Sequence, residues 1–578
     1  MCSTTNLFLL PAAMATDNRF SLSNATKITF SVIFFFISFD RGSFKKIFFF
    51  TEAFTMTTLL YVCFTLLLLS RNELTSSTIV KTNDDEAVNR RKKSNIVFLL
   101  TDDQDVLLGG VEPMKELKEH IASKGTQFSR AYAHTPICCP SRSSFLTGRY
   151  LHNSLTFQNS IATGCGNDTW ASGPETRTYA VHASRAGYTT FYAGKYLNTY
   201  AMVGSPGCTK PNEAGCFAHV PPGWDHWHAL QGNSRYYNGT VSNDGVPTIH
   251  GDEPQDYLPD VFFGHLKSFL TQHFEKDKKI RKPFLSVLAT PSCHGPFTPA
   301  DKYKGRFANA SAPRTPNWNA SNEDKQWLMR QQAPLTELLA QSIDETHNAR
   351  WETMLSVDDY VEQIVDILES AGELDSTYFF FSSDHGFQLG QHRLAIDKRH
   401  LYEHDIRIPL IVRGPGVAWN RTLDSIVLNI DIAPTFVDIM GLDIPEDMDG
   451  RSFLPLLLGT DEDDVAWRRD FMIDYHGSGN PTCGLQFCPA PTRSVFHEND
   501  ALNNTYGCVR TIDPQSDRDS IYCEFDDDEH FIEYYDHTAD PWQLKNLYPS
   551  EQSRSDLTAF RNRLREFRAC KGESCRGL

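Results

Sequence analysis

The sequence predicts an α/β protein with a large, mostly parallel sheet sandwiched by helices, and a smaller C-terminal α+β domain that contains an antiparallel sheet. Three observations support this fold class. Apolar runs of strand length recur between residues 95 and 413, helical patterns lie between them, and from about residue 471 the runs become short and alternate around cysteines. Strands that alternate with helices indicate a parallel sheet covered on both faces.

The apolar runs are continuous rather than alternating, which is typical of strands buried on both faces. The clearest helical pattern between them places apolar residues at 357, 360, 361, 364, 367 and 368 and ends near Gly372. We expect a closing helix at residues 556–570. The expected strands of the large sheet are residues 95–101, 188–193, 284–289, 378–383 and 409–413.

The chain divides into four parts by composition. We predict a leader at residues 1–72 with a signal peptide within 56–75, a linker at 73–93, a catalytic domain at 94–465 and a C-terminal subdomain at 466–578. No apolar run of the leader reaches the twenty residues of a membrane span, so we expect no stable insertion. A membrane anchor is the alternative.

The formal charge of -17 argues against general binding to nucleic acid. An acidic protein can bind an anionic substrate only through a local cluster of cationic side chains or a metal. With 40% hydrophobic and 22% charged residues, the composition is that of a globular protein without repeats.

Cysteines and glycosylation motifs favour the secretory pathway. Close spacing suits local disulfides at Cys208 with Cys216, Cys483 with Cys488, Cys508 with Cys523, and Cys570 with Cys575. If Cys138 is set apart, an odd number of cysteines follows the leader, so we expect a free thiol at Cys139 or Cys293. The candidate glycosylation sites are Asn167, Asn238, Asn309, Asn319, Asn420 and Asn503.

Polar residues follow four of the expected strands, where ligands bind in open α/β sheets. They are Asp102 with Asp103, Lys195, His294, and Asp384 with His385. An Asp-Asp pair alone is more often a solvated turn. Here the three carboxylates and the imidazole close apolar strands, where uncompensated charge is costly, so they suit a divalent cation such as calcium or magnesium.

A helix start follows Cys138. Pro140 and Ser141 are typical of the first helical turn, so Cys138 is expected at a helix N-terminus that favours an anion. Arg142 lies one turn further on. A disulfide or a buried thiol is the ordinary interpretation of such a Cys-Cys-Pro turn.

The segment from Cys138 to Arg149 resembles the C-x-P-S-R-x-x-x-x-T-G-R signature of the sulfatase family. The resemblance implies that a formylglycine-generating enzyme oxidises Cys138 to formylglycine during secretion, and that the hydrated aldehyde attacks the sulfur of a sulfate ester. It also implies one calcium ion held by Asp102, Asp103, Asp384, His385 and the residue made from Cys138. Asn is common in the family at the position of His385, which leaves zinc or manganese conceivable.

The same resemblance gives roles to further residues. Arg142 is expected to pair with the nucleophile or a ligand oxygen, and Lys195, His294 and Lys398 to hold the sulfate or protonate the leaving oxygen. Many sulfatases have a histidine two residues after the lysine matched by Lys195. This chain has Leu197 there, so His294 becomes the candidate general acid.

Residues 187–198, 219–224 and 233–238 are similar to the branch of the family that removes 6-sulfate groups from N-acetylglucosamine in heparan sulfate and keratan sulfate. That branch implies a sulfated glycosaminoglycan as substrate and a lysosomal location, with an extracellular one as the alternative. The oligomeric state stays open, a homodimer included. The expected sugar-binding wall consists of Tyr196, Asn198, Trp224, Trp227, Asn233 and Tyr236.

Two other functions fit parts of this pattern. A phosphatase or phosphodiesterase of the related alkaline-phosphatase-like superfamily would share the sheet and the carboxylates but normally uses Ser or Thr and two zinc ions. An inactive glycan-binding homologue would keep the fold without turnover. The cysteine signature and the single metal set favour the sulfatase.

Overall fold

The computed structural model describes residues 29–40, 43–55, 93–211, 213–460, 467–478, 500–513, 515–548 and 555–578. The N-terminal unit contains an antiparallel pair of strands, β1 (Thr29–Asp40) and β2 (Ser43–Thr55). The predicted signal peptide at 56–75 and nearly all of the linker lie outside these ranges. Among the helices that are described, none combines the length and apolarity needed to cross a membrane.

A ten-stranded mixed sheet organises the second unit, and its central strands run parallel. The parallel block is β11, β3, β10, β6 and β7, with antiparallel pairs on both sides. In spatial order the strands are β13 (Arg421–Leu423), β4 (Thr126–Phe128), β12 (Leu410–Arg413), β11 (Thr377–Ser383), β3 (Asn95–Thr101), β10 (Phe284–Ala289), β6 (Thr189–Lys195), β7 (His226–Leu230), β8 (Thr240–Asn243) and β9 (Val246–Ile249).

The predicted fold class is confirmed, with one refinement at residues 409–413. That run forms β12, which pairs antiparallel with β11, so its C-terminal end points to the opposite edge of the sheet. A continuous apolar run shows that a strand is buried on both faces but does not give its direction. A small parallel pair, β5 (Ala131–Tyr132) and β14 (Val427–Leu428), lies outside the large sheet.

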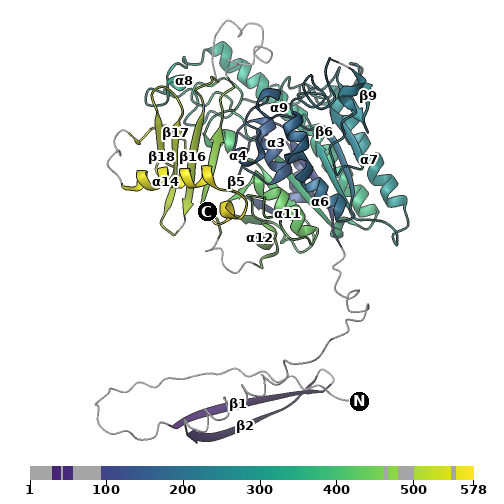
Figure 1. Cartoon of the computed structure of the whole chain (residues 1–578), viewed down its shortest axis with the longest axis vertical. Helices are drawn as coiled ribbons and strands as arrows, with labels where there is room; N and C mark the ends of the chain where they lie inside the picture. The colour runs from purple at the N-terminus through teal and green to yellow at the C-terminus, as the bar shows by residue number, and fades with distance from the viewer. Residues whose placement is uncertain are drawn as a thin grey trace. The chain divides into compact units, whose positions relative to one another are not determined.

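Helices cover both faces of the sheet, as Figure 1 shows. Side chains alternate along β3: Ile96, Phe98 and Leu100 join one apolar cluster, and Val97 and Leu99 join another. The first cluster includes residues of α3 (Cys138–Thr147), α6 (Tyr179–Arg185), α11 (Ile432–Ile439) and α12 (Leu454–Leu458), and the second those of α7 (Leu258–Glu275) and α9 (Glu337–Ser370).

Helix α9 is longer than its clearest apolar pattern indicated. The Thr336 side chain caps its start by accepting a hydrogen bond from the Leu339 amide at 3.3 Å. It ends at Ser370, two residues before Gly372, which has a left-handed φ of 62°. Shorter helices are α4 (Leu151–Ser154), α5 (Asp168–Ser172), α8 (Trp327–Arg330) and α10 (Glu403–Ile406).

The C-terminal sheet is antiparallel and four-stranded, in the order β15 (Asp470–Tyr475), β16 (Tyr506–Asp513), β17 (Arg518–Phe525) and β18 (Ile532–Asp536). The closing helix α14 (Ser555–Ala569) packs on it through Leu557, Phe560, Leu564 and Phe567. A last short helix, α15 (Glu573–Arg576), follows. The antiparallel sheet and closing helix expected from the sequence are therefore present.

The described cysteines form four disulfides: Cys139–Cys165, Cys208–Cys216, Cys508–Cys523 and Cys570–Cys575. Three of them are the local pairs expected from spacing, whereas Cys483 and Cys488 lie outside the described residues. Cys138 and Cys293 are free and buried among the described cysteines. Cys293 is therefore the free thiol of the two candidates, because Cys139 pairs with Cys165.

His134, behind α3, makes the fold sensitive to acid. Burial lowers its pKa to about 4 although Asn429 hydrogen-bonds to its ring. The unfolded value is about 6.5, so the neutral ring contributes stability that is present above pH 6.5 and is lost as pH falls toward 4. We expect His134→Gln to reduce the loss of unfolding free energy between pH 7.5 and 4.5 by about 2 to 3 kcal/mol. Urea unfolding at both pH values measures it, and His530→Gln, at an exposed site, should leave the loss unchanged.

Candidate active site

Four neighbouring parallel strands deliver polar residues to one edge of the sheet. Asp102 and Asp103 follow β3, Lys195 ends β6, and Asp384 and His385 follow β11. His294 lies five residues after β10. The strand ends are in register, since Thr101 pairs with Ser383 and Ala289 pairs with both Leu100 and Gly194. The side chains selected from the sequence are therefore neighbours.

The carboxylates form one buried group. Asp102, Asp103, Asp384 and His385 are each at most 1% exposed. The Asp103 amide donates to Asp384 Oδ1 at 3.1 Å, which fixes two of the carboxyl residues to each other. Ligand atoms of Asp102, Cys138, Asp384 and His385 all lie within 4.8 Å of one another, and those of Asp102, Asp103, Cys138 and His294 form an overlapping set.

Three permanent cations neutralise these carboxylates. Lys195 Nζ lies 2.6 Å from Asp102 Oδ2, and Lys398 Nζ lies 2.7 and 2.9 Å from the two oxygens of Asp103. Arg142 Nε donates to Asp384 Oδ2 at 2.8 Å. Three negative and three positive charges balance. A bound dication would leave the site positively charged, as the capture of an anionic ester requires.

Burial and neighbouring charges shift the pKa values of the acidic and imidazole groups at this site. Burial and the charge of Asp102 raise the pKa of Asp384 to about 6. Burial lowers the pKa of His385, but the neighbouring Asp384 and Cys138 outweigh it and raise the value to about 9. Burial raises the pKa of Asp102, yet Lys195, His294 and Arg142 hold it well below its usual range.

The donor set fits a divalent metal ion. Three carboxylates offer hard oxygen ligands, which suit calcium or magnesium, and one imidazole can complete the set. Arg142 Nη2 is buried, has no hydrogen-bond partner among the described residues and lies 3.6 Å from Asp102 Oδ2, beside the same group. Asp102, Asp103, Asp384 and His385 are divided between the two overlapping groups of candidate ligands.

Cys138 opens helix α3, at the centre of this group. Its Sγ lies 3.8 Å from Asp102 Oδ1 and 3.4 Å from His385 Nε2. Burial raises the pKa of the thiol, but Lys195 and Lys398 together hold it well below its usual range. The helix ends at Gly148, whose φ of 69° closes it with a left-handed residue. An anion is thus favoured at the position of Cys138.

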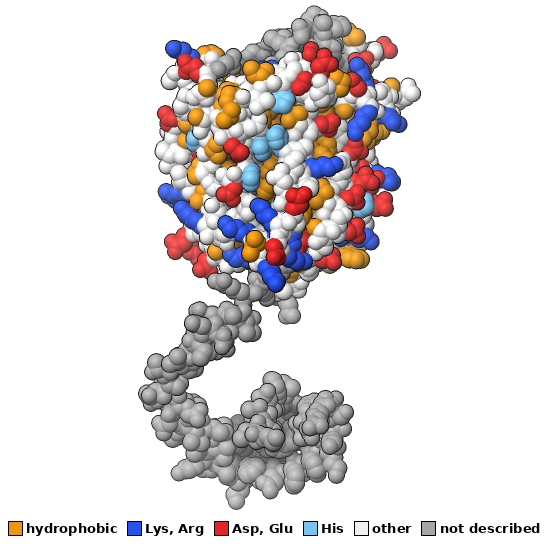
Figure 2. Space-filling model, turned by 90° about the vertical axis from the view of Figure 1, so that its right-hand side faces the viewer, with side chains coloured by type: hydrophobic (Ala, Val, Ile, Leu, Met, Phe, Trp, Pro, Cys, Tyr) orange, Lys and Arg blue, Asp and Glu red, His pale blue; other side chains and the backbone are white. Residues whose placement is uncertain are grey.

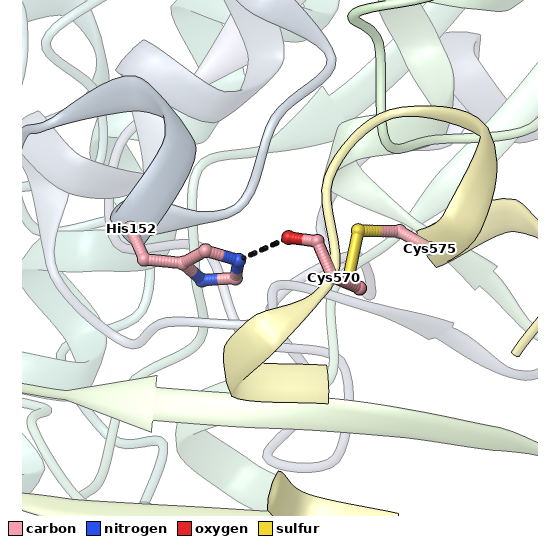
Figure 3. Close-up of side chains that lie close together, drawn as sticks. All are labelled: His152, Cys570 and Cys575. Carbon is pink, nitrogen blue, oxygen red and sulfur yellow. Dashed lines mark hydrogen bonds between the residues drawn. A yellow bond between two sulfur atoms is a disulfide. The ribbon is translucent and has the colours of Figure 1, made fainter. Parts of the chain in front are cut away.

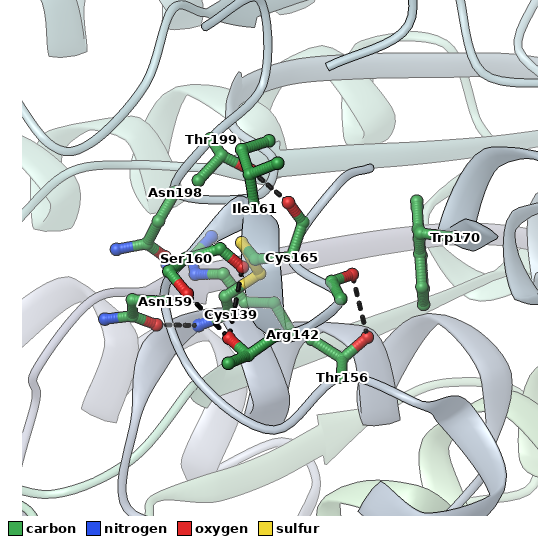
Figure 4. Close-up of a disulfide and its surroundings, with 12 residues drawn as sticks. Cys139, Arg142, Thr156, Asn159, Ser160, Ile161, Cys165, Trp170, Asn198 and Thr199 are labelled. Carbon is green, nitrogen blue, oxygen red and sulfur yellow. Dashed lines mark hydrogen bonds between the residues drawn. A yellow bond between two sulfur atoms is a disulfide. The ribbon is translucent and has the colours of Figure 1, made fainter. Parts of the chain in front are cut away.

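The residues after Cys138 lock the helix start in place. The Cys139 amide donates to Asn159 Oδ1 at 2.8 Å, and Cys139 is joined to Cys165 (Figure 4). Arg142, drawn beside that disulfide, donates from Nη1 to the Lys195 carbonyl oxygen at 2.7 Å. Helix α3, the end of strand β6 and the carboxylates are therefore joined by hydrogen bonds into one network.

Two residues at the site had not been singled out in the sequence. Ser234 Oγ donates to Asp102 Oδ2 at 2.5 Å and is 8% exposed. Arg350 of α9 donates from Nη2 to the Asp103 carbonyl oxygen at 2.9 Å and pairs with Asp105 at 2.5 Å. Ser234 directly follows Asn233, which the sequence analysis had placed in the expected sugar-binding wall. Arg350 could have been recognised because it is an arginine on the buried face of an amphipathic helix.

The aromatic residues of the expected sugar-binding wall lie in the core. Trp227 is fully buried, Tyr196 is 2% exposed and its hydroxyl donates to Glu175 at 3.0 Å. Trp224 is 8% exposed, and Tyr236 donates to the His294 carbonyl oxygen at 2.9 Å. These four rings are therefore packed in the interior and do not form an exposed wall.

The two amides of the expected wall lie together instead. Asn198 Nδ2 donates to Asn233 Oδ1 at 3.1 Å, and Asn198 Oδ1 has no hydrogen-bond partner in the described part of the chain. Leu197, at the position of the family histidine, is fully buried in the apolar cluster.

A third group contains residue types that can bind metal but is held together by a disulfide. His152 lies near Cys570 and Cys575, but the two sulfurs form a disulfide and offer no thiolate (Figure 3). His152 Nε2 is hydrogen-bonded to the Cys570 carbonyl oxygen at 2.9 Å. This group ties α4 to the residue that follows α14 and is structural.

Carboxylates, lysines and a helix N-terminus at the carboxyl edge of a parallel sheet define a hydrolase of anionic esters. Comparison with known proteins gives the family: a model described as Sulfatase matches residues 94–442. The chain belongs to the sulfatase family and is a sulfuric ester hydrolase.

Similar proteins cover most of the chain. N-acetylglucosamine-6-sulfatases of Bos taurus and Homo sapiens are each 43% identical over 82% of this chain, covering 83% and 84% of their own lengths. A solved structure of a protein in complex with its substrate D-glucosamine-2-N,6-O-disulfate has a TM-score of 0.65 at 22% identity, covering 84% of this chain and 98% of that one. The latter similarity shows the shared fold.

Replacing Ser234 tests whether its hydrogen bond positions the Asp102 carboxylate for catalysis. A hydrogen bond to a charged group contributes about 1.5 to 3 kcal/mol, so we expect Ser234→Ala to lower kcat for sulfate ester hydrolysis roughly 10- to 100-fold while the protein stays folded. Steady-state kinetics with circular dichroism as a check on folding measures this. Ser172→Ala, at an exposed position of α5, is the matched control. An unchanged kcat in Ser234→Ala would exclude the positioning role.

Proposed function

We propose that this chain hydrolyses the 6-O-sulfate ester of N-acetylglucosamine residues in glycosaminoglycans, with heparan sulfate and keratan sulfate as its polymers. The observation that carries the proposal is the set of Lys195, Lys398 and His294 around Cys138 in a chain that is 43% identical to N-acetylglucosamine-6-sulfatases along most of both lengths. The relatives' names supply the sugar and the position of the sulfate.

Cys138 is proposed to be converted to formylglycine before the chain folds. The side chain is 1% exposed and lies between Asp102 and His385, so a modifying enzyme cannot reach it in the folded protein. This favours a formylglycine-generating enzyme that acts during secretion. The hydrated aldehyde would supply one hydroxyl that attacks sulfur and a second whose deprotonation releases sulfate.

The cationic side chains are proposed to bind and orient the ester. Lys195 is paired with Asp102, and Lys398 is paired with Asp103. Both positive charges lower the pKa of the group at position 138. Sulfate oxygens placed beside that position would exchange part of the carboxylate pairing for charge-assisted hydrogen bonds. Arg142 holds Asp384 in place through the hydrogen bond from its Nε to Asp384 Oδ2.

His294 is proposed as the general acid that protonates the leaving sugar oxygen. Burial lowers its pKa, but the charges of Asp103 and Asp102 outweigh burial and raise it above the usual value. The ring therefore keeps its proton to a higher pH than an ordinary imidazole does. Its Nδ1 is 2.6 Å from the Gly295 carbonyl oxygen, which leaves Nε2 directed toward Asp103 at 4.0 Å.

Calcium is the proposed ion, held by Asp102, Asp103, Asp384 and His385 together with the residue formed from Cys138. An ion there would supply positive charge to the sulfate oxygens and the attacking hydroxyl. The predominance of carboxylate oxygens favours calcium over zinc. Beyond the ion, Asn198 and Asn233 are the proposed contacts to the sugar ring, and Tyr196, Trp224, Trp227 and Tyr236 are proposed to hold those amides in place.

The proposed location is the lysosome, reached through the secretory pathway. Among the candidate glycosylation sites, Asn238, Asn309 and Asn420 are exposed. Asn167 and Asn319 are half-buried and hydrogen-bonded, Asn167 Nδ2 to the Ile161 carbonyl oxygen and Asn319 Oδ1 to the Leu335 amide. Asn503 is half-buried too. We therefore propose the exposed three as the main sites.

Cys138 can be tested against the other free cysteine. We expect Cys138→Ala to abolish sulfate release and Cys293→Ala to keep it within about threefold, since the Cys293 thiol donates to the Asp103 carbonyl oxygen at 3.7 Å and otherwise packs in the apolar cluster that contains Val97 and Leu99. Peptide mass spectrometry should find an aldehyde at position 138 in protein made with a formylglycine-generating enzyme. Equal activity of modified and unmodified protein would contradict the nucleophile.

A panel of monosaccharide sulfates tests the substrate. We expect kcat/KM for N-acetylglucosamine 6-sulfate to exceed that for its 3-sulfate isomer and for N-acetylgalactosamine 4-sulfate by at least about 100-fold, because unpaired polar groups at the site penalise the wrong isomer. Ion chromatography of released sulfate measures the rates. Equal rates across the panel would leave the family membership intact and remove the proposed specificity.

A further inference from the structure

A buried carboxylate outside the metal-ligand group collects three side chains from separate segments. Glu175 is 1% exposed. Trp170 Nε1 donates to its Oε1 at 3.1 Å, and the Tyr196 hydroxyl donates to the same oxygen at 3.0 Å. His219 Nε2 lies 2.6 Å from Oε2. Because a buried carboxylate is costly unless its partners replace water, these bonds hold the three segments together.

The same carboxylate joins the two segments that carry the proposed sugar contacts. Tyr196 lies two residues before Asn198, and the chain runs from His219 through strand β7 to Asn233. The two segments meet again where Asn198 Nδ2 donates to Asn233 Oδ1 at 3.1 Å. A change in the bonds of Glu175 therefore reaches both amides.

Neutral contacts hold the rest of the turn around His219. The Tyr200 hydroxyl donates to the His219 carbonyl oxygen at 2.9 Å and accepts from Trp227 Nε1 at 2.7 Å. Cys208 and Cys216 form a disulfide just before this residue. None of these contacts gains or loses a charge between about pH 5 and 8. The bond between the imidazole and the buried carboxylate, by contrast, depends on a proton.

His219 differs from histidines elsewhere in the molecule. Figure 2 shows histidine side chains gathered on the face that carries α7. On that helix, burial and the charge of the stacked His228 lower the pKa of His265 to about 4. Burial also lowers the pKa of His219, but the bond to Glu175 and its charge, with a smaller contribution from Asp168, outweigh burial and raise it. The side chain of His219 is 25% exposed, so solvent protons reach it.

We propose that Glu175 and His219 form a proton-dependent link that positions residues 195–198 and the segment leading to Asn233, so that the sugar of the substrate binds best in acid. We call this pair the Glu175–His219 link. Both are positioning residues, because they act through the segments that they join. The inference rests on the proposed contacts of Asn198 and Asn233 to the sugar ring and adds the condition that keeps them in place.

The direction of the pH effect follows from the charges that face the ring, which are those of Glu175 and Asp168. A protonated His219 neutralises the carboxylate, and a neutral one leaves it without a counter-charge. The folded pKa of His219 lies above the unfolded value of about 6.5, so the link is fully present below pH 6.5 and is lost as pH rises through the folded pKa. The pKa of Tyr196 is well above its usual value and that of Tyr200 is about 12, so neither hydroxyl ionises there.

Steady-state kinetics from about pH 5.5 to 8.5 test the link in protein made with a formylglycine-generating enzyme. We expect KM for N-acetylglucosamine 6-sulfate to rise roughly 5- to 30-fold with pH in the unaltered protein. Glu175→Gln keeps hydrogen-bonding groups but no charge, so it should show the high KM at every pH, with kcat at pH 5.5 within about threefold. His265→Gln is the matched control and should keep the rise, because its pKa of about 4 lies outside this range.

A measurement without substrate separates the link from the proposed specificity. Hydrogen exchange of residues 217–225, corrected for the intrinsic effect of pH, should be slow at pH 5.5 and faster at pH 8.5 in the unaltered protein, and fast at both in Glu175→Gln and in His219→Gln. If the unaltered protein hydrolysed no N-acetylglucosamine ester, the proposed function would fail while exchange still decided the link. An equal rise of KM in Glu175→Gln, or exchange at 217–225 that is independent of pH, would overturn the proposal.

Discussion

The burial of Asp102, Asp103 and Asp384 at one edge of the sheet is the constraint on which the active site depends. Removing a carboxylate from water costs several kcal/mol unless partners replace the lost hydration. Lys195, Lys398 and Arg142 supply that replacement at 2.6 to 2.8 Å. Because these cations are fixed by the carboxylates, they are already oriented before an anionic substrate arrives, and binding does not have to order them.

The C-terminal sheet supports this arrangement through the residue next to Lys398. Arg399 donates from Nη1 to the Tyr475 hydroxyl of β15 and to Asp500, each at 3.3 Å, and its carbonyl oxygen accepts from the Tyr506 hydroxyl of β16 at 3.2 Å. Lys398 and Arg399 both contact Asp397, so the loop is held between the two sheets. The C-terminal sheet therefore has a direct part in placing Lys398.

Features that depend on local sequence pattern could be predicted, whereas contacts between segments distant in the sequence could not. Continuous apolar strands and the polar residues after them located the sheet and its functional edge, because parallel strands end side by side. The direction of β12, the Cys139–Cys165 pair and the bond from Ser234 to Asp102 could not be predicted, since each joins segments with no common pattern. Aromatic residues such as Trp227 pointed to a sugar wall, but a large ring buries more favourably in a core.

Leu197 places an apolar side chain where the family resemblance predicts a titratable one. It is fully buried among apolar side chains, so no titratable group can act from the position where many sulfatases have a histidine. His385 Nε2 lies 3.4 Å from Cys138 Sγ, and His294 Nε2 lies 4.0 Å from Asp103 Oδ2. Each imidazole donates or accepts through Nε2 because a backbone carbonyl holds the other nitrogen. The imidazoles of this site therefore face the carboxylate cluster through Nε2.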